Sequence, residues 1–551
     1  MKNTAKILAV SSLSVLAVSC DSFLDINQNP NNPLTVTADA ILAQALTTTA
    51  NTYSINYNPY SAFAAGYVAK SGTVNGYAPE RTYNYNSNFS QTLFTNTFDN
   101  IYDYDIIERQ GKAANQPYHS AIAKIMKVYN YQLLVDQYGD IPYSKALGGL
   151  ANITPVYDKA DAIYKDFIVK LNEAIAEIDA ANKQTSPIPR AVGAEDVVFQ
   201  GTMTSWVRFA NSLKLRILMR QSSQPTLSSY VSTEMTRLQA SIASGTPGAA
   251  GFITTDVVCN PGYVQASGQQ NPFWDRYRAD AGGTSSTERY YTLPTKYLLA
   301  QFLLNRDPRG YRIFNTTATG FTGGAELGES APLPGNAATR FRDFGGVFKG
   351  PDAPVPLMLR AEDLFSQAEA RERGFFTGGS AKNDFNAGIT ASFNYFYTPS
   401  PANRQNATRD SSAFVAAKVT KYLTAAVNVN NGLVNWDVTT TQIPEANIFG
   451  GARVTAATYT ARLTTPRSVT NQEKIIYQKY LAMTGVASTE AWDDYRRTGY
   501  PRFAPSLQTT SPRPDKLPTR LLYPQSEITT NLANLPQGIS QFTTLIFWDP
   551  S

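Results

Sequence analysis

Histidine is almost absent from this 551-residue chain, which contains only His119. A single imidazole excludes multi-histidine metal centres, an HExxH zinc pair and a serine–histidine relay that needs a second, independent histidine. His119 stands in QPYHSAIAK, just before an apolar helical pattern. We therefore interpret it as a residue of a helix N-terminus, and we predict no catalytic residues, no metal site and no cofactor.

Strong charge and long apolar runs are also missing. The formal net charge is +5, from 48 Lys+Arg and 43 Asp+Glu, and the basic residues are scattered without a basic block. This distribution gives no electrostatic footprint for nucleic acid. Beyond residue 19 no apolar run reaches the ~20 residues that span a bilayer, and the glycine-rich pieces GTPGAAG and GFTGGAELG match neither a P-loop nor a dinucleotide-binding motif. We expect a soluble body.

The first 40 residues predict export and a lipid anchor. Lys2 and Lys6 precede an apolar stretch from residue 7 to 18, which is the pattern of a secretory signal. The exit residues LAVS directly precede Cys20 and resemble the lipobox of bacterial lipoproteins; an ordinary cleavage site is the alternative. We predict a signal peptide at 1–19, lipidation of Cys20 and a tether at 20–40, where Asn and Pro interrupt any helix.

The second cysteine, Cys259, has no intrachain partner if Cys20 carries lipid, so no disulfide framework is expected. Nothing near it in DVVCNPGY would lower the thiol pKa. We predict that Cys259 is a small buried side chain and that a large core stabilises the protein.

Amphipathic helices recur along the chain. The clearest is DKADAIYKDFIVKLNEAIAEIDAA, whose apolar stripe comprises Ala160, Ile163, Tyr164, Phe167, Leu171, Ala174, Ile175 and Ile178. Helices with one apolar stripe must stack on neighbours, as in tetratricopeptide-type solenoids. We predict an all-α fold with a helical scaffold mainly at 90–240, 355–395 and 470–500, within one body at 41–551. Loop-rich, ligand-facing insertions are expected mainly at 41–90, 240–350 and 395–470.

Several motifs together resemble one known family. They occur in the order CDSFLDINQNPNNP, LLVDQYGDIPYSKAL, WVRFANSLKLRILMR, AEDLFSQAEARERG, IIYQKYLAMTG, WDDYRRTGYP and RLLYPQSEITTNLAN. Each is weak alone, but as a set covering nearly the whole chain they are similar to the SusD/RagB outer-membrane lipoproteins. In this comparison Trp206 and Trp492 lie in core motifs and are expected to be packing residues.

The resemblance implies an all-α, tetratricopeptide-like fold with an irregular subdomain, anchored by lipid and exposed on the cell surface at the outer membrane. It implies a non-enzymatic receptor that captures oligosaccharides for a SusC-type TonB-dependent transporter. A peptide-binding receptor of the RagB kind is the alternative, and a surface glycoside hydrolase is a third reading.

Two segments combine aromatic rings with polar side chains, the mixture that a sugar receptor needs. From NGYAPERTYNYNSNF we select Tyr77, Arg81 and Tyr83, and from QQNPFWDRYR we select Asn271, Trp274 and Tyr277. The competing interpretation of these aromatic residues is that they pack the subdomain onto the helices.

The densest acidic cluster is FDNIYDYDIIERQ, where Asp99 and Asp103 share a helix face. The resemblance implies that some relatives bind calcium, and carboxylates with backbone oxygens are the ligands that this cluster would offer. We interpret the cluster as a solvated helix and do not predict a metal there.

Overall fold

The computed structural model describes residues 37–70, 76–243, 245–316, 321, 324–329, 339–401, 412–428, 431–442, 466–502, 506 and 517–550. The predicted signal peptide, Cys20 and most of the tether lie outside these residues. Within the described part, helices predominate and paired strands form only short two-stranded ladders. The all-α prediction is confirmed. No helix there is both long enough and apolar enough to cross a bilayer.

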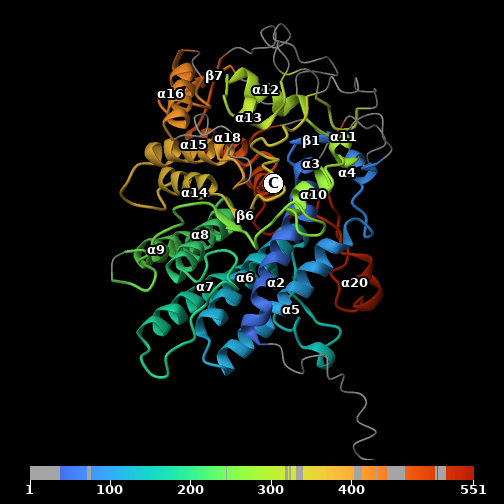
Figure 1. Ribbon diagram of the computed structural model, residues 1–551, viewed down its shortest axis with the longest axis vertical. Helices are drawn as coiled ribbons and strands as arrows, with labels where there is room; N and C mark the ends of the chain where they lie inside the picture. Colours follow the sequence, from blue (N-terminus) through green and yellow to red (C-terminus); the bar gives the residue numbers. More distant parts are fainter. Residues whose placement is uncertain are drawn as a thin grey trace, which may run out of the picture.

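Most of the N-terminal helices lie in the lower half of the molecule in Figure 1, and α3 (Asn58–Ala64) lies above them, near the centre. The N-terminal helices are α2 (Ala38–Thr52), the π-helix η1 (Tyr53–Tyr57), α3, α5 (Gln91–Ala113), α6 (Pro117–Tyr138), α7 (Ala160–Lys183), α8 (Met203–Gln221) and α9 (Ser228–Ser241). From α5 to α9, each helix packs against the next along the chain. This is the neighbour-on-neighbour stacking of a helical repeat scaffold.

A second helical group lies at the upper left of Figure 1. Its members are α14 (Arg360–Glu372), α15 (Ala381–Tyr397), α16 (Ser412–Asn428) and α18 (Asn471–Ala482). α14 packs against α15 and α18 and also contacts α8, so it joins the two groups. α19 (Ser488–Thr498) packs against α3 and contacts α8.

Short elements make up the remaining, irregular part. The helical ones are α4 (Ala78–Thr82), α10 (Pro272–Tyr277), α11 (Glu288–Tyr291), α12 (Lys296–Leu304), α13 (Gly310–Ile313), α20 (Gln525–Thr530) and the 3-10 turns η2 (Gly149–Ala151) and η3 (Pro225–Leu227). The antiparallel ladders pair β1 (Val68–Lys70) with β5 (Thr292–Pro294), β2 (Ile141–Pro142) with β3 (Tyr157–Asp158), β4 (Val257–Cys259) with β6 (Val355–Met358), and β7 (Thr440–Thr441) with β8 (Arg467–Ser468).

Helix α7 shows how the sequence pattern becomes a scaffold element. All eight residues of the predicted stripe are buried, while the intervening charged residues face outward. Asp161 in the first turn and Lys183 in the last complement the helix dipole. Burial of each large apolar side chain of the stripe contributes about 1.5–3 kcal/mol, so packing against α6 and α8 holds the helix.

Segment 41–90 differs from the loop-rich prediction, because α2, η1 and α3 form a nearly continuous helical stretch at 38–64. Its run of threonines weakens the local helical signal. Tertiary hydrogen bonds compensate: the buried Thr49 hydroxyl bonds Tyr104 Oη at 2.9 Å and accepts from Asn100 Nδ2 at 2.7 Å. In segment 395–470, likewise, 412–428 form α16.

Candidate functional site

The two segments selected from the sequence lie in the same region of the structure. α4 and α10 are neighbours of α3, β1 and α11 at the right of Figure 1. The half-buried Tyr77 ring packs against Phe63 with 5.1 Å between centroids. Phe63 and Tyr277 line one narrow apolar cavity of about 30 Å³. Tyr77 therefore packs on a residue that lines the same cavity as Tyr277.

Tyr83, by contrast, is fully buried, as is Tyr85. Burial also raises the pKa of the Tyr83 hydroxyl. A ring without exposed surface cannot stack on a ligand in this conformation, so the structure makes Tyr83 a packing residue. Arg81 is half-buried, and its backbone carbonyl accepts a hydrogen bond from the Ser506 hydroxyl.

Both polar atoms of the Asn271 side-chain amide form hydrogen bonds within the protein. Its Oδ1 accepts from the backbone N–H of Trp274 at 2.9 Å and caps α10, and its Nδ2 donates to the Ala353 carbonyl at 2.7 Å. Its backbone N–H donates to the Pro351 carbonyl at 2.6 Å. Asn271 therefore fixes α10 to the 350–353 loop and has little hydrogen-bonding capacity left for a ligand.

Trp274 is only 4 % exposed. Its ring contacts Phe344 at 4.9 Å between centroids, and the Arg278 guanidinium lies 5.2 Å from the ring centroid. Tyr277, 8 % exposed, packs against Phe273 at 5.1 Å. These burials agree with the packing interpretation of both residues; neither ring presents a free face to solvent.

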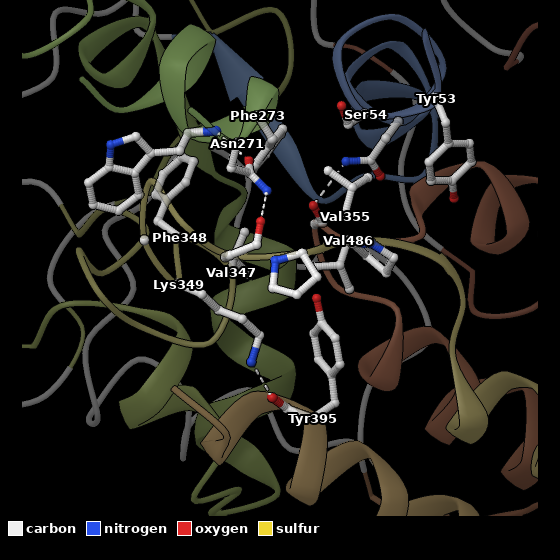
Figure 2. Close-up of a pocket in the computed structure, with 17 residues that line it drawn as sticks. Tyr53, Ser54, Asn271, Phe273, Val347, Phe348, Lys349, Val355, Tyr395 and Val486 are labelled. Carbon is white, nitrogen blue, oxygen red and sulfur yellow. Dashed lines mark hydrogen bonds between the residues drawn. The ribbon is translucent and has the colours of Figure 1, made fainter. Parts of the chain in front are cut away.

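Figure 2 shows the cavity beneath α10, into which Asn271, Phe273, Lys349 and Tyr395 project. Its volume of about 40 Å³ holds a few water molecules, since one water needs roughly 10–15 Å³. Small-molecule sites usually measure about 300–1,000 Å³. The cavity is therefore too small for a sugar ring.

Two exposed aromatic rings lie close to the segments selected from the sequence. Tyr290 is 42 % exposed, and the guanidinium groups of Arg289 and Arg340 lie 5.9 and 5.1 Å from its ring centroid. Phe344, also 42 % exposed, covers Trp274. The Asp343 carboxylate, next to Phe344 in sequence, accepts from Arg289 at 2.5 Å and so links the segment of Phe344 to that of Tyr290. We name Arg289, Tyr290, Arg340, Asp343 and Phe344 the aromatic surface.

Phe344 is one of several non-glycine residues with a positive φ, and Tyr77 and Tyr83 are others. Phe344 has φ +50°, a left-handed conformation that costs a non-glycine residue about 1–2 kcal/mol. Such strain persists only where the surroundings hold it, and the Phe344 ring packs on Trp274.

The aromatic surface could not be recognised in the sequence. The residues of this surface come from segments 289–290 and 340–344, which are around 50 positions apart. The selected segment 271–277 supplies the support beneath Phe344 instead of the exposed rings. The tripeptide RYY at 289–291 carried a local signal of the same aromatic and basic type.

A larger cavity of about 530 Å³ lies among α5, α6 and α7. Part of its charged lining is paired within the cavity: Lys127 contacts Asp105 at 2.7 Å and Glu108 at 3.2 Å, and the Tyr143 hydroxyl donates to Asp166 at 2.6 Å. Two carboxylates of the acidic cluster are thus held by cations. Among the described residues, no group of three or more His, Cys, Asp or Glu side chains is placed to hold a metal ion.

The remaining sequence predictions concern buried residues. His119 is buried in the first turn of α6, with Nε2 3.1 Å from Glu195 Oε1; burial lowers its pKa, although Glu195 opposes this. Cys259 is a free, buried thiol, and Trp206 and Trp492 are buried, as predicted.

Comparisons with known proteins agree with the fold. Residues 30–524 match the SusD-like family described as "Starch-binding associating with outer membrane". A comparison with curated protein sequences finds no match. Among solved structures, a chitin-binding protein is 20% identical, with TM-score 0.68 over 94% of this chain and 100% of that one.

Two further solved structures are similar. A chitin-binding SusD homologue from Flavobacterium johnsoniae is 21% identical, with TM-score 0.67 over 92% of this chain and 98% of that one. A SusD homologue from Bacteroides uniformis is 23% identical, with TM-score 0.65 over 92% and 99%. At these identities the structures show a shared fold. With the family match over most of its length, the chain belongs to the SusD-like family.

Proposed function

We propose that this protein is a lipid-anchored receptor on the cell surface that captures oligosaccharides and delivers them to a SusC-type TonB-dependent outer-membrane transporter. The receptor binds the glycan without cleaving it. The family description supports glycan binding and outer-membrane association, and the LAVSC sequence at Cys20 supports the lipid anchor.

The aromatic surface carries the proposal. A pyranose ring has a face of C–H groups that stacks on an aromatic ring, and a rim of hydroxyls that needs charged or amide partners. Tyr290 and Phe344 offer exposed rings, and Arg289, Arg340 and Asp343 surround them with donors and acceptors. An open surface of this kind suits a chain of sugars better than a single enclosed ring.

Two of the proteins with similar structures are chitin-binding proteins. They favour a β-linked glycan of N-acetylated sugars as the first ligand to test here, with starch fragments as the second because of the family description. The N-acetyl methyl group would add apolar contact with a ring such as Phe344.

Isothermal titration with chitohexaose, maltoheptaose and a mixed peptide library tests the ligand class. We expect one of the two glycans to bind and the binding to survive 0.5 M NaCl, because stacking is weakly screened. Tyr290→Ala should weaken binding about tenfold, whereas Tyr102→Ala, at an equally exposed tyrosine on α5, should not change it. Binding of peptides alone would contradict the proposal, as would turnover of the bound glycan.

The transporter partnership needs a separate experiment. Affinity purification of the lipidated protein from outer membranes should recover a TonB-dependent transporter in stoichiometric amount. The Tyr290→Ala protein should recover the same amount, because its change concerns the glycan surface only.

A further inference from the structure

A polar groove runs between α2 and the segment that leads into α10. Its lining residues are Gln44, Thr47, Thr48 and Asn51 from α2, and Tyr263, Gly268, Gln270, Pro272 and Asp275 from the other side. The α2 residues recur at spacings of three and four and therefore share one helix face. The volume of about 330 Å³ reaches the range of small-molecule sites, about 300–1,000 Å³.

The groove is separate from the aromatic surface. α10 turns Phe273 and Trp274 toward the cavity of Figure 2, whereas Pro272 and Asp275 line the groove on another side of the same helix. None of the residues that define the aromatic surface lines the groove.

Two buried polar atoms at the groove have no hydrogen-bond partner in the structure. They are Tyr263 Oη and Gln270 Oε1, on side chains that are 9 % and 5 % exposed. A buried polar atom without a partner costs about 1–3 kcal/mol, and most such atoms in proteins are paired. Gln270 is oriented by its Nε2, which donates to Asp275 Oδ1 at 2.7 Å and to the Ala279 carbonyl at 3.3 Å.

The segment that presents these atoms is internally braced. Val264 N–H donates to the Gln269 carbonyl at 2.9 Å, and Gln269 N–H donates to the Ala266 carbonyl at 3.0 Å. Gly268 lies between them with φ +71°, a conformation that disfavours any side chain, and it keeps the groove wall free of a Cβ. The groove is therefore formed before any ligand arrives.

The chemistry of the lining selects a neutral, hydroxyl-rich ligand. It offers amides from Gln44, Asn51 and Gln270, hydroxyls from two threonines and a tyrosine, and a single carboxylate, Asp275. No lysine or arginine lines it, so nothing there compensates the charge of a phosphate, sulfate or uronate. One carboxylate already accepting from an amide is also a poor cation site.

We propose that this groove is a second glycan-binding site, which holds one or two neutral sugar units through hydrogen bonds to Tyr263, Gln270 and the polar face of α2. The inference rests on the proposed function for its ligand class, but not on the aromatic surface. A sugar hydroxyl donates to Gln270 Oε1, and another exchanges a hydrogen bond with the Tyr263 hydroxyl. The ligand thereby satisfies both buried atoms.

The test uses triacetylchitotriose and maltotriose as probes in ligand-observed NMR titrations. Tyr290→Ala/Phe344→Ala first removes the aromatic surface, and we expect one trisaccharide still to bind this double variant. Adding Tyr263→Phe should weaken the residual binding about threefold to tenfold, because it deletes the tyrosine hydroxyl that exchanges a hydrogen bond with the sugar. Gln44→Ala/Asn51→Ala in the same background should do the same, and alanine is well tolerated in a helix.

Tyr131→Phe is the matched control, since it also removes a buried hydroxyl without a partner, 2 % exposed, but from α6. It should leave both binding and thermal stability unchanged. Tyr263→Phe should likewise retain or raise the melting temperature, which separates loss of a ligand contact from unfolding.

The outcomes distinguish the two proposals. If the unmodified protein binds glycan and the double variant does not, the proposed function stands and the groove site is overturned. The groove site is also overturned if Tyr263→Phe leaves residual binding unchanged. If no glycan binds the unmodified protein, both fail. If only the groove variants lose binding, the groove site is supported and the aromatic surface loses its assignment.

Discussion

The indole N–H of Trp548 donates a hydrogen bond of 2.9 Å to the carboxylate of Asp136, across 412 positions of sequence. Asp136 is buried on α6 and also accepts from the Tyr164 hydroxyl of α7. The fully buried Trp548 ring lies beside the guanidinium groups of Arg496 and Arg220, at 4.8 and 5.4 Å from the ring centroid. The C-terminal segment is therefore a structural part of the helical scaffold.

Replacement of Trp548 should destabilise the whole protein. Trp548→Ala should lower the free energy of unfolding by about 3–5 kcal/mol, through lost packing and a cavity. Trp548→Phe keeps most of the ring but leaves Asp136 with one hydrogen bond fewer, so a loss of about 1–3 kcal/mol is expected. Denaturant unfolding measures both. Leu532→Ala, at a side chain 56 % exposed, is the control and should change stability by less than about 0.5 kcal/mol.

Asp136 belongs to a buried ion-pair network that the sequence pattern could not reveal. Arg216 and Arg220 of α8 carry full charges, yet both are at most 4 % exposed. Arg216 pairs with Glu362 of α14, and Arg220 with Asp493 of α19 at 2.5 Å. Periodicity reports hydrophobic faces; it cannot show that a carboxylate from 146 or more positions away will neutralise a buried cation.

The motifs that carried the family resemblance supply most of these charges. Asp136 stands in LLVDQYGDIPYSKAL, Arg216 and Arg220 in WVRFANSLKLRILMR, and Glu362 and Glu369 in AEDLFSQAEARERG. Arg497 of WDDYRRTGYP pairs with Glu369 at 2.6 Å, and both are buried. The motifs therefore identify the scaffold, because they contain the charged residues that pair with one another in its core. They carry little information about the ligand.

A double-mutant cycle on Arg216 and Glu362 should show strong coupling. Their side chains form two hydrogen bonds, Nε–Oε1 at 2.7 Å and Nη2–Oε2 at 2.9 Å. Arg216→Met removes the hydrogen-bonding partner of Glu362, and Glu362→Leu leaves Arg216 with only Glu490 at 3.3 Å. Each should cost about 3–5 kcal/mol, while the double variant should cost far less than the sum. Unfolding free energies of the four proteins give the coupling.

The surface pair Lys165 and Asp161 is the control for that cycle, because both side chains are more than 40 % exposed. Its coupling should stay below about 0.5 kcal/mol. Additive effects for Arg216 and Glu362 would show that the buried pair does not act as a unit.

Glu80 should make stability fall as pH rises through neutrality. Burial raises its pKa to about 7, against the opposing charge of Arg81, whereas an unfolded glutamate titrates near 4.3. Protonated Glu80 therefore favours the folded state, with its contribution complete below about pH 4.3 and lost as pH passes about 7. Because the side chain is half-buried, the free energy of unfolding should fall by about 1–3 kcal/mol over this pH range.

Glu80→Gln tests this dependence, because the amide mimics the neutral acid at every pH. Unfolding free energies of the two proteins at pH 5 and pH 8 should diverge, with the Gln variant more stable at pH 8. Parallel pH profiles would show that Glu80 titrates normally.

The ligand surface was less predictable than the scaffold for a related reason. Tyr77, Trp274 and Tyr277 were selected by local composition, but a run of aromatic and polar residues does not state which rings become buried. Trp274 packs beneath Phe344, and the exposed rings come from two other segments. Exposure depends on the tertiary arrangement of short elements that have no periodicity of their own.

Cys259 should be chemically silent in the folded protein. Burial raises its thiol pKa to about 12, so at pH 8 roughly one molecule in ten thousand carries the reactive thiolate. A variant that begins at Asp21 has Cys259 as its only cysteine. Ellman's reagent should label it only after guanidinium is added. Rapid stoichiometric labelling without denaturant would contradict the burial.

Variants of Phe344 can separate the effect of its left-handed backbone on stability from the effect of its ring on glycan binding. Phe344→Gly relieves the left-handed backbone while removing the ring, so its unfolding free energy should remain within about 1 kcal/mol of the original. Phe344→Ala loses the same ring but keeps the strain, and should be about 1 kcal/mol less stable than the Gly variant. Both should bind the glycan about threefold to tenfold more weakly, and Phe344→Tyr should restore affinity. If the Gly and Ala variants bind as tightly as the original protein, the ring does not contact the glycan, whatever the backbone strain contributes.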